Sequence, residues 1–240
     1  MNQSEIGTLY GISVGTGDPE LITIKGLRLI KNTTVIAFPE GINNRIGVAE
    51  KIIAQWLQPS QIKVSLKFPY VKDQTVLEEA WHKSAEKVWQ YLAQGQDVAF
   101  ACEGDVSFYS SFTHLARTIK QLYPNVKIVT IPGVCSPVAA ASDLGLPLTV
   151  NRQRLTILPA LDRVEELELA LNTAEVVVLF KVNSVYQKVW HILQQFNLLE
   201  SSYIVEKAGS GDRAFYQNLT QYPDLKLSYF SLLVVNCDRV

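Results

Sequence analysis

The sequence predicts an α/β protein made of two domains, and three observations support this class. Its 240 residues are 48% hydrophobic and 19% charged, as expected for a globular protein with a substantial core. Up to about residue 144, strand-like apolar runs alternate with amphipathic helical segments, which is typical of parallel βαβ units with helices on both faces of a sheet. The alternation breaks at 145–153 (GLPLTVNRQ), so we expect one domain at 1–148 and a second at 149–240.

The expected first domain follows from hydrophobic periodicity and from the positions of glycine and proline. In 45–56 the apolar residues recur at helical spacing, whereas 61–68 alternates strictly, as a half-buried strand does. Segment 73–94 has a long apolar face, whose aromatic residues favour core packing over a cofactor contact. We predict strands at 8–14, 33–38, 61–68, 97–102 and 125–131, and helices at 19–30, 45–56, 73–94, 107–123 and 135–144.

The expected second domain has more strands and fewer helices, which predicts a mixed sheet. The continuous apolar run at 175–180 indicates a buried strand, and the glycine-rich stretch at 209–212 indicates a loop. We predict strands at 154–161, 175–180, 202–208 and 229–237, and helices at 163–172 and 185–196.

Charge, cysteine content and hydropathy exclude several classes of function. The formal net charge is -1 and the pI is about 6.3, so no basic surface for nucleic acid is expected. No apolar run is long enough to span a bilayer, and the N-terminus lacks the pattern of a signal peptide. The 3 cysteines and 3 histidines are widely separated, so they predict neither a disulfide framework nor a metal site. We therefore expect a cytoplasmic protein with no membrane or nucleic-acid partner.

Three glycine-containing loops follow predicted strands, at 15–20 (GTGDPE), 102–109 (CEGDVSFY) and 132–136 (PGVCS). The first loop matches neither GxGxxG nor a P-loop, so it does not indicate a dinucleotide fold or a phosphate cradle. In parallel sheets, the carboxyl ends of the strands form the crevice in which ligands bind. We therefore expect the three loops to face one cleft, although each by itself is also compatible with a plain tight turn.

The sequences of these loops resemble the signatures of one family. Segment 11–30 (GISVGTGDPELITIKGLRLI) is similar to VGxGPGDPELLTLKAxRxI, and 103–115 (EGDVSFYSSFTHL) is similar to EGDPxFYSTFxxL. Segment 132–149 (PGVCSPVAAASDLGLPLT) is similar to PGVSSxxAAAAxLGxPL. These are signatures of the tetrapyrrole methylases, the class III S-adenosylmethionine-dependent methyltransferases. With LTILPA, VLFKVN and IVEKAG, the likeness extends over nearly the whole chain. Thr16 and Val106 stand where the family usually has proline, which leaves both loops more flexible.

The resemblance implies an activity and a site for the methyl donor. Within the family, FYS and LTILPA are most similar to the enzymes that methylate precorrin-2, or cobalt-precorrin-2, at ring carbon 20 in cobalamin biosynthesis. It implies that S-adenosylmethionine lies in a cleft between two αβα-type domains, held mostly by main-chain groups. The residues implied as donor-binding are Gly15, Gly104, Asp105, Val106, Phe108, Cys135, Ser136, Lys181 and Ala208. For Lys181, an exposed lysine at a helix cap is the alternative.

The resemblance also implies residues that meet the substrate. Asp18 is expected to act as a general base or an orienting carboxylate, and the alternative is that it caps the helix predicted to begin at Pro19. The implied substrate carries carboxylates, and Arg45 and Arg152 are their expected partners because both lie in loop-like stretches beside predicted strand ends. The implied partners are a small-molecule tetrapyrrole and a second copy of the chain, in a homodimer, and no metal site is implied.

Two alternatives stay open at the level of the sequence. In the first, a methyltransferase of this family acts on uroporphyrinogen III, a later precorrin, a diphthamide precursor or an RNA base. Segment 208–215 (AGSGDRAF) replaces the GTTPxQ-like turn of the uroporphyrinogen enzymes, which argues against that substrate. In the second, the chain is a module that binds a nucleotide or a tetrapyrrole without turnover.

Overall fold

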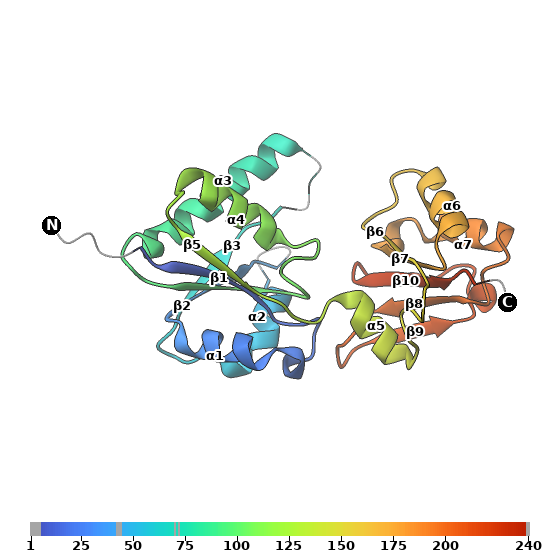
Figure 1. Ribbon diagram of the computed structural model, residues 1–240, viewed down its shortest axis with the longest axis horizontal. Helices are drawn as coiled ribbons and strands as arrows, with labels where there is room; N and C mark the ends of the chain where they lie inside the picture. The colour runs from blue at the N-terminus through green and yellow to red at the C-terminus, as the bar shows by residue number, and fades with distance from the viewer. Residues whose placement is uncertain (1–5, 42–44, 70, 72, 239–240) are drawn as a thin grey trace. The chain divides into compact units, whose positions relative to one another are not determined.

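The structure is a computed structural model of the chain, and it describes residues 6–41, 45–69, 71 and 73–238. The chain divides into two compact units, Met1–Cys135 and Ser136–Val240 (Figure 1). This division falls at the start of helix α5 (Ser136–Leu144), whereas the sequence placed the domain boundary after residue 148. The difference concerns which unit α5 belongs to, and each unit is described by itself below.

The first unit contains a parallel sheet, as its alternating sequence predicted. Its strands are hydrogen-bonded in the order β3-β2-β4-β1-β5, and every pairing is parallel. The strands are β1 (Thr8–Ser13), β2 (Val35–Pro39), β3 (Ile62–Leu66), β4 (Val98–Cys102) and β5 (Lys127–Ile131). Because β4 and β5 flank β1, the loops that follow these three strands begin side by side at one edge of the sheet.

Helices cover both faces of this sheet (Figure 1). On one face lie α1 (Ile24–Asn32) and α2 (Val48–Ile53), and on the other lie α3 (Gln74–Leu92) and α4 (Ser111–Leu122). Alternate residues of β4 belong to two separate core clusters, one on each face of the sheet. Phe100 packs among residues of α3 and α4, whereas Ala99 and Ala101 pack with residues of α1 and α2. The period of two along a strand thus divides the core of this unit into two layers.

The first helix differs from the prediction, which had one helix at 19–30. The structure has a 3₁₀ turn, η1 (Pro19–Leu21), and then a separate helix α1. Ile22 between them is extended, with ψ 132°. Thr23 caps α1 by accepting a hydrogen bond from the Gly26 N–H at 3.1 Å. The segment predicted as one helix therefore forms two elements. Asp18 caps η1 and Thr23 caps α1, and a capping residue has an extended backbone, which interrupts the helix.

The second unit contains the mixed sheet that the sequence predicted. Its strand order is β6-β7-β10-β8-β9, in which β6 and β7 are parallel and the remaining pairings are antiparallel. The strands are β6 (Leu155–Leu158), β7 (Val176–Phe180), β8 (Ser202–Glu206), β9 (Ala214–Gln217) and β10 (Ser231–Asn236). The sequence did not predict β9, because its residues (AFYQ) form neither a sustained apolar run nor a strict apolar–polar alternation.

Two helices pack on one face of this second sheet, α6 (Val164–Thr173) and α7 (Tyr186–Gln195), as Figure 1 shows. Short 3₁₀ turns adjoin them, η4 (Val182–Ser184) before α7 and η5 (Leu219–Gln221) between β9 and β10. The apolar sides of β7, β8 and β10 form one core with these helices.

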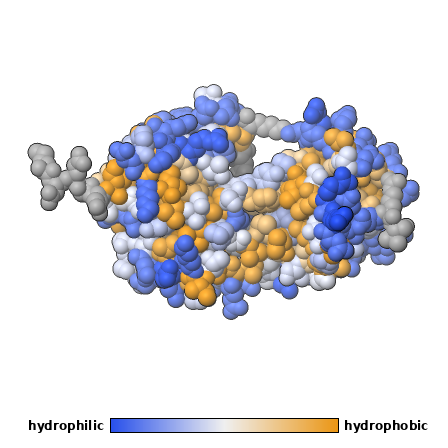
Figure 2. Space-filling model, viewed as in Figure 1, coloured by the Kyte–Doolittle hydropathy of each residue, from blue (hydrophilic) through white to orange (hydrophobic). Residues whose placement is uncertain are grey.

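The surface carries isolated apolar residues. Figure 2 shows hydrophobic residues on the visible surface of both units, set between hydrophilic ones. Among the bulky aliphatic residues that the structure describes, the largest exposed fractions are 88% for Ile24 and 64% for Leu169. Within the described ranges, no helix combines the length and the apolar character that a membrane span requires.

Candidate functional site

The three glycine-containing loops of the first unit are joined to one another by hydrogen bonds. The first two loops are joined at an isolated bridge between Gly15 and Gly104, where the Gly104 N–H donates to the Gly15 carbonyl at 2.7 Å. Just before this bridge, the Val14 N–H donates to the Cys102 carbonyl at 2.9 Å and so extends the pairing of β1 with β4. The loops that the sequence expected at one edge of the sheet are therefore in direct contact.

A buried serine at the end of β1 connects the same loops. Ser13 is fully buried, and its hydroxyl donates to the Ile131 carbonyl at 2.8 Å. The same oxygen accepts from the Val106 N–H at 2.8 Å and lies 3.3 Å from a carboxylate oxygen of Asp105. A hydroxyl has one proton to donate, so the shorter contact to Ile131 is the donated bond. Ser13 thus links the ends of β1 and β5 with the loop after β4.

Asp105 is the central acceptor of this network. One carboxylate oxygen accepts from the Gly133 N–H at 2.7 Å, and the other accepts from the Ser107 N–H at 2.8 Å and from the Ser107 hydroxyl. Burial by itself raises the pKa of Asp105, but the hydrogen bonds from Ser107 and Gly133, with the nearby Ser13 hydroxyl, outweigh it and hold the pKa below its usual value. The carboxylate is therefore occupied with joining the loops, which leaves main-chain groups of this loop to contact a ligand.

Glycine is required here for two different reasons. A Cβ on Gly133 would lie 2.5 Å from the Cβ of Ser13, so the third loop can approach β1 only without a side chain. Gly104 has a φ of +68°, and a Cβ there would meet no atom within 4 Å. The space beside Gly104 is thus open to a molecule that approaches the backbone closely.

Two polar groups beside the bridge were missed as site residues by the sequence interpretation. Thr16 follows Gly15, is 9% exposed, and its hydroxyl makes no hydrogen bond to any described residue. Glu103 precedes Gly104, is half-buried, and its carboxyl has no hydrogen bond or ion pair among the same residues. Burial raises the pKa of Glu103 to about 7. Two features of the sequence could have pointed to these residues: a threonine where the family usually has proline, and an acid directly before the glycine of the second loop.

The predicted residues of the first unit lie as follows. Asp18 caps η1, since its carboxylate accepts from the Glu20 N–H at 2.8 Å, so the capping alternative is observed in the structure. Phe108 is half-buried and packs edge-on to Tyr109, with ring centres 4.8 Å apart. Cys135 is a half-buried free thiol at the end of the third loop. Arg45 is exposed in the loop before α2.

The predicted residues of the second unit lie in strand-end loops. Lys181 follows β7 with a left-handed backbone, φ +53°, and its Nζ lies 5.8 Å from the centre of the Tyr229 ring. It is the capping residue of η4 but makes no side-chain capping bond. Ala208 is buried in the loop after β8, and the Gly209 N–H of that loop donates to Asp143 of α5 at 2.6 Å. Ser136 is the first residue of α5.

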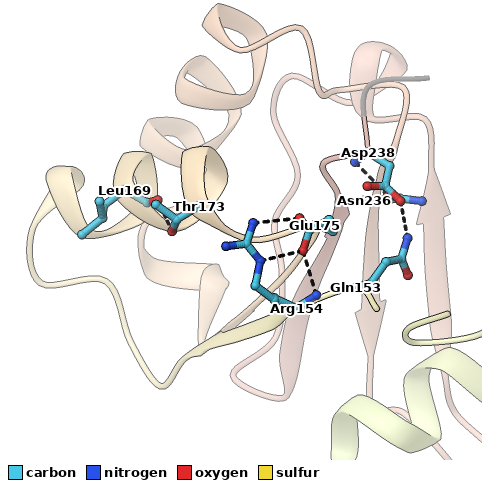
Figure 3. Close-up of polar contacts among 7 residues, drawn as sticks. All are labelled: Gln153, Arg154, Leu169, Thr173, Glu175, Asn236 and Asp238. Carbon is cyan, nitrogen blue, oxygen red and sulfur yellow. Dashed lines mark hydrogen bonds and ion pairs between the residues drawn. The ribbon is translucent and has the colours of Figure 1, made fainter. Parts of the chain in front are cut away.

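Surface hollows in the second unit lie at the opposite edge of its sheet. A hollow of about 320 Å³ is lined by Arg154, Glu175 and the end of α6, and a hollow of about 300 Å³ beside it is lined by Arg152 and Glu175. Arg154 and Glu175 form a bidentate ion pair, with Nη2–Oε1 2.8 Å and Nε–Oε2 3.1 Å (Figure 3). The side-chain hydrogen bond from Arg154 lowers the pKa of Glu175 to about 2.

These hollows do not support a ligand site for the predicted chemistry. Arg154 and Glu175 directly precede the parallel strands β6 and β7, whereas Lys181 follows β7. Arg152 and Lys181, the two cations predicted in this unit, therefore lie at opposite edges of the sheet. Ligands of parallel sheets bind at the carboxyl ends of strands, and the hollows are at the amino ends. No group of His, Cys, Asp or Glu side chains suited to a metal ion occurs among the residues that the structure describes.

Glu103→Gln is expected to raise the free energy of unfolding at pH 8 by about 1–3 kcal/mol. At that pH the folded wild type contains a half-buried carboxylate that has no partner among the described residues, and glutamine removes this charge. Since the folded-state pKa is raised, this penalty grows between about pH 4.5 and pH 7 and vanishes below that window. Chemical denaturation at pH 8 and pH 4 measures it. The control Glu79→Gln removes the negative charge that pairs with Lys83 on the exposed side of α3, and it should have a smaller effect of the opposite sign. Equal stability of Glu103→Gln and wild type at pH 8 would contradict the prediction.

Comparison with known proteins places this arrangement in a family. Residues 8–222 match the Tetrapyrrole (Corrin/Porphyrin) Methylases. The chain is 31% identical over 240 residues to the cobalamin biosynthesis protein CobIJ of Mycobacterium bovis, an alignment that covers 95% of this chain and 46% of that protein. The chain therefore spans about half the length of CobIJ.

Two relatives match from end to end. The precorrin-2 C(20)-methyltransferase of a Sinorhizobium species is 29% identical over 238 residues, covering 96% of this chain and 95% of that protein. The cobalt-precorrin-2 C(20)-methyltransferase of Salmonella typhimurium is 27% identical over 231 residues, covering 96% of each.

The fold has been seen in solved structures. The uroporphyrin-III C-methyltransferase of Thermus thermophilus, complexed with S-adenyl homocysteine, matches with a TM-score of 0.65 and 19% identity, covering 96% of this chain and 97% of that chain. At this identity the likeness concerns the fold, which is the α/β fold with one parallel and one mixed sheet described above. Because the family match spans most of the residues and includes the three joined loops, the chain belongs to the tetrapyrrole (corrin/porphyrin) methylases.

Proposed function

We propose that this chain transfers a methyl group from S-adenosylmethionine to ring carbon 20 of precorrin-2 or cobalt-precorrin-2, in cobalamin biosynthesis. The observation that carries the proposal is the end-to-end likeness to the Sinorhizobium and Salmonella enzymes, whose names state this activity with and without cobalt. Nothing in the described residues distinguishes the two forms of the substrate, because a metal held by the tetrapyrrole needs no ligand from the protein.

The loops of the first unit fit a methyl donor. A sulfonium ligand with an amino-acid tail requires neutral hydrogen-bonding groups and an apolar wall, and the open space beside Gly104 exposes main chain to such a ligand. We assign direct contacts to Gly15, Gly104, Phe108 and Cys135, and the support is their place on the joined loops. Asp105 and Val106 act by holding these loops in place. The assignments of Ser136, Lys181 and Ala208 rest on the family resemblance alone.

The chain's contribution to methyl transfer is alignment and exclusion of water. When bound, S-adenosylmethionine supplies an electrophilic methyl group, and the reaction requires that the ring carbon approach it in line. Asp18 is assigned as a carboxylate that orients the substrate or accepts a proton, and Arg45 is assigned to substrate carboxylates. Arg152 was predicted to share the role of Arg45, but it lines a hollow at the amino ends of the strands, so its place in the second unit gives that assignment no support. The proposal includes a homodimer that works in the cytoplasm, for which the family resemblance is the support.

The test is to incubate the purified chain with S-adenosylmethionine and, separately, precorrin-2, cobalt-precorrin-2 and uroporphyrinogen III. A mass gain of one methyl group on either form of precorrin-2, assigned to carbon 20 with a ¹³C-labelled methyl donor, is expected. A mass gain on uroporphyrinogen III alone would overturn the assignment of precorrin-2 as the substrate. Binding of donor and tetrapyrrole without any mass gain would favour the module that binds without turnover.

Asp18→Asn separates the two roles considered for Asp18. Asparagine caps a helix about as well as aspartate, so the stability should change by less than roughly 0.5 kcal/mol while the carboxylate is lost. Turnover is expected to fall by about 10²-fold with the dissociation constant of the donor unchanged. Steady-state kinetics with a donor-binding titration measure this. Unchanged turnover would leave Asp18 with capping as its only role.

A further inference from the structure

Two polar groups in the first unit are unused by the network that joins the loops. They are the hydroxyl of Thr16 and the carboxyl of Glu103, which lie next to the two glycines of the Gly15–Gly104 bridge. A buried hydroxyl without a partner is unfavourable, and so is a half-buried carboxylate without one. Most buried polar groups in native proteins are hydrogen-bonded, so this pair indicates that a partner outside the described protein atoms completes the site.

Three other ionisable side chains of the first two loops, those of Cys102, Asp105 and Asp18, are either neutral or already hydrogen-bonded. Burial raises the pKa of the Cys102 thiol to about 12, with the charges of Glu103 and Asp105 adding to the effect, so this thiol is neutral at physiological pH. Asp105 is held ionised by its hydrogen bonds. On the first loop, the Asp18 carboxylate is already hydrogen-bonded as the cap of η1. The Glu103 carboxyl can therefore take up or release a proton near neutral pH without breaking a contact to any residue that the structure describes.

We propose that Glu103 accepts the proton that the ring carbon loses during methyl transfer, and that the Thr16 hydroxyl forms a hydrogen bond to the same bound tetrapyrrole. The inference rests on the proposed function and deepens it, because it assigns the proton acceptor to the second loop. Asp18 then keeps the orienting role of the two considered for it.

The step is balanced as follows. The new carbon–carbon bond forms with an electron pair of the ring, and the bond between sulfur and the methyl group breaks with its pair left on sulfur. Glu103 takes the proton from the methylated ring carbon, and the electrons of that carbon–hydrogen bond restore the conjugation of the ring. The resulting carboxylic acid gives its proton to solvent after the product leaves. A base whose pKa is near the working pH suits this transfer, because it is ionised before the step and protonated after it.

The test of Glu103 measures the single-turnover rate constant of methyl transfer between pH 5.5 and pH 9, at saturating donor and substrate. Glu103→Gln is expected to lower it about 10²–10³-fold, with the donor dissociation constant within about 2-fold of wild type. The wild-type rate should rise with pH through about 7 and then level, and the variant should lose this rise. Glu103→Asp should recover part of the rate. The control Glu20→Gln removes an exposed carboxylate from η1 and should leave the rate within about 2-fold.

The test of Thr16 uses Thr16→Val, which keeps the shape of the side chain and removes the hydroxyl. The KM for the tetrapyrrole is expected to rise about 10-fold, while the melting temperature is unchanged or higher, because the hydroxyl makes no hydrogen bond to a described residue that the change would remove. Thr16→Ser retains the hydroxyl and should bind the tetrapyrrole like wild type. An unchanged KM in Thr16→Val would overturn the role of Thr16.

The outcomes for Glu103 separate this inference from the proposed function. Methyl transfer by Glu103→Gln within about 5-fold of wild type, with the same pH dependence, overturns the role of Glu103 and leaves the proposed function standing. Absence of methyl transfer by the wild type to any tetrapyrrole overturns the proposed function and this inference together. Loss of donor binding in Glu103→Gln contradicts a role confined to proton transfer.

Discussion

Asp105→Ala is expected to lower the free energy of unfolding of the first unit by roughly 3–5 kcal/mol, because it leaves the donors of a buried network without their acceptor. The Gly133 N–H loses its partner, the Ser107 N–H and hydroxyl lose theirs, and the buried Ser13 loses a neighbouring charge. The same change releases the third loop from the second. Donor binding should therefore weaken at least about 10-fold, although the carboxylate itself is assigned no contact with the donor.

Denaturation and a donor-binding titration at pH 7 measure both effects of Asp105→Ala. The control Asp73→Ala makes the same chemical change at the exposed cap of α3, where the loss should be roughly 1 kcal/mol and donor binding should be unaffected. The folded-state pKa of Asp105 is lowered, so its contribution is present at neutral pH and is lost as the pH falls below its usual value near 3.8. A loss no larger than that of Asp73→Ala would show that the carboxylate does not hold the loops together.

Gly133→Ala is expected to be the second most damaging of these changes, with a loss of roughly 2–3 kcal/mol and weaker donor binding. The added Cβ would lie 2.5 Å from the Cβ of Ser13, and because the backbone fixes the position of every Cβ, the backbone must move to relieve the overlap. That movement separates the Gly133 N–H from Asp105 and disturbs the hydroxyl that links β1 to β5.

The control for Gly133→Ala is Gly211→Ala, where a Cβ meets nothing within 4 Å. It should change the free energy of unfolding by less than roughly 0.5 kcal/mol. Thermal or urea unfolding compares the two variants, and a titration gives the dissociation constant of the donor. Equal free energies of unfolding for the two variants would mean that the third loop can move away from β1 without destabilising the fold, which would contradict the prediction.

Part of the site could be predicted from the sequence because its signals are local. Glycine and an acid after an apolar run predict a loop at a strand end, and this is where Gly15 and Gly104 lie. The apolar run at 97–102 predicted the strand β4, and its five residues (VAFAC) are all buried, as a continuous apolar run in a parallel sheet usually is. The break between η1 and α1 and the short edge strand β9 were missed, because a second cap inside a periodic segment and a four-residue strand give weak local patterns.

The sequence by itself determined the α/β class, the parallel first sheet, the mixed second sheet and the three loops, because periodicity and turn residues act within a few positions of the chain. Only the tertiary structure decided what each polar side chain does. Asp105 was predicted to meet the donor, but it bonds Gly133, 28 positions away, and lies beside Ser13, 92 positions away. Thr16 and Glu103 became candidates because folding buried the Thr16 hydroxyl and half-buried the Glu103 carboxyl, neither with a partner among the described residues. Partnership and burial depend on residues distant in the chain, so no local pattern encodes them.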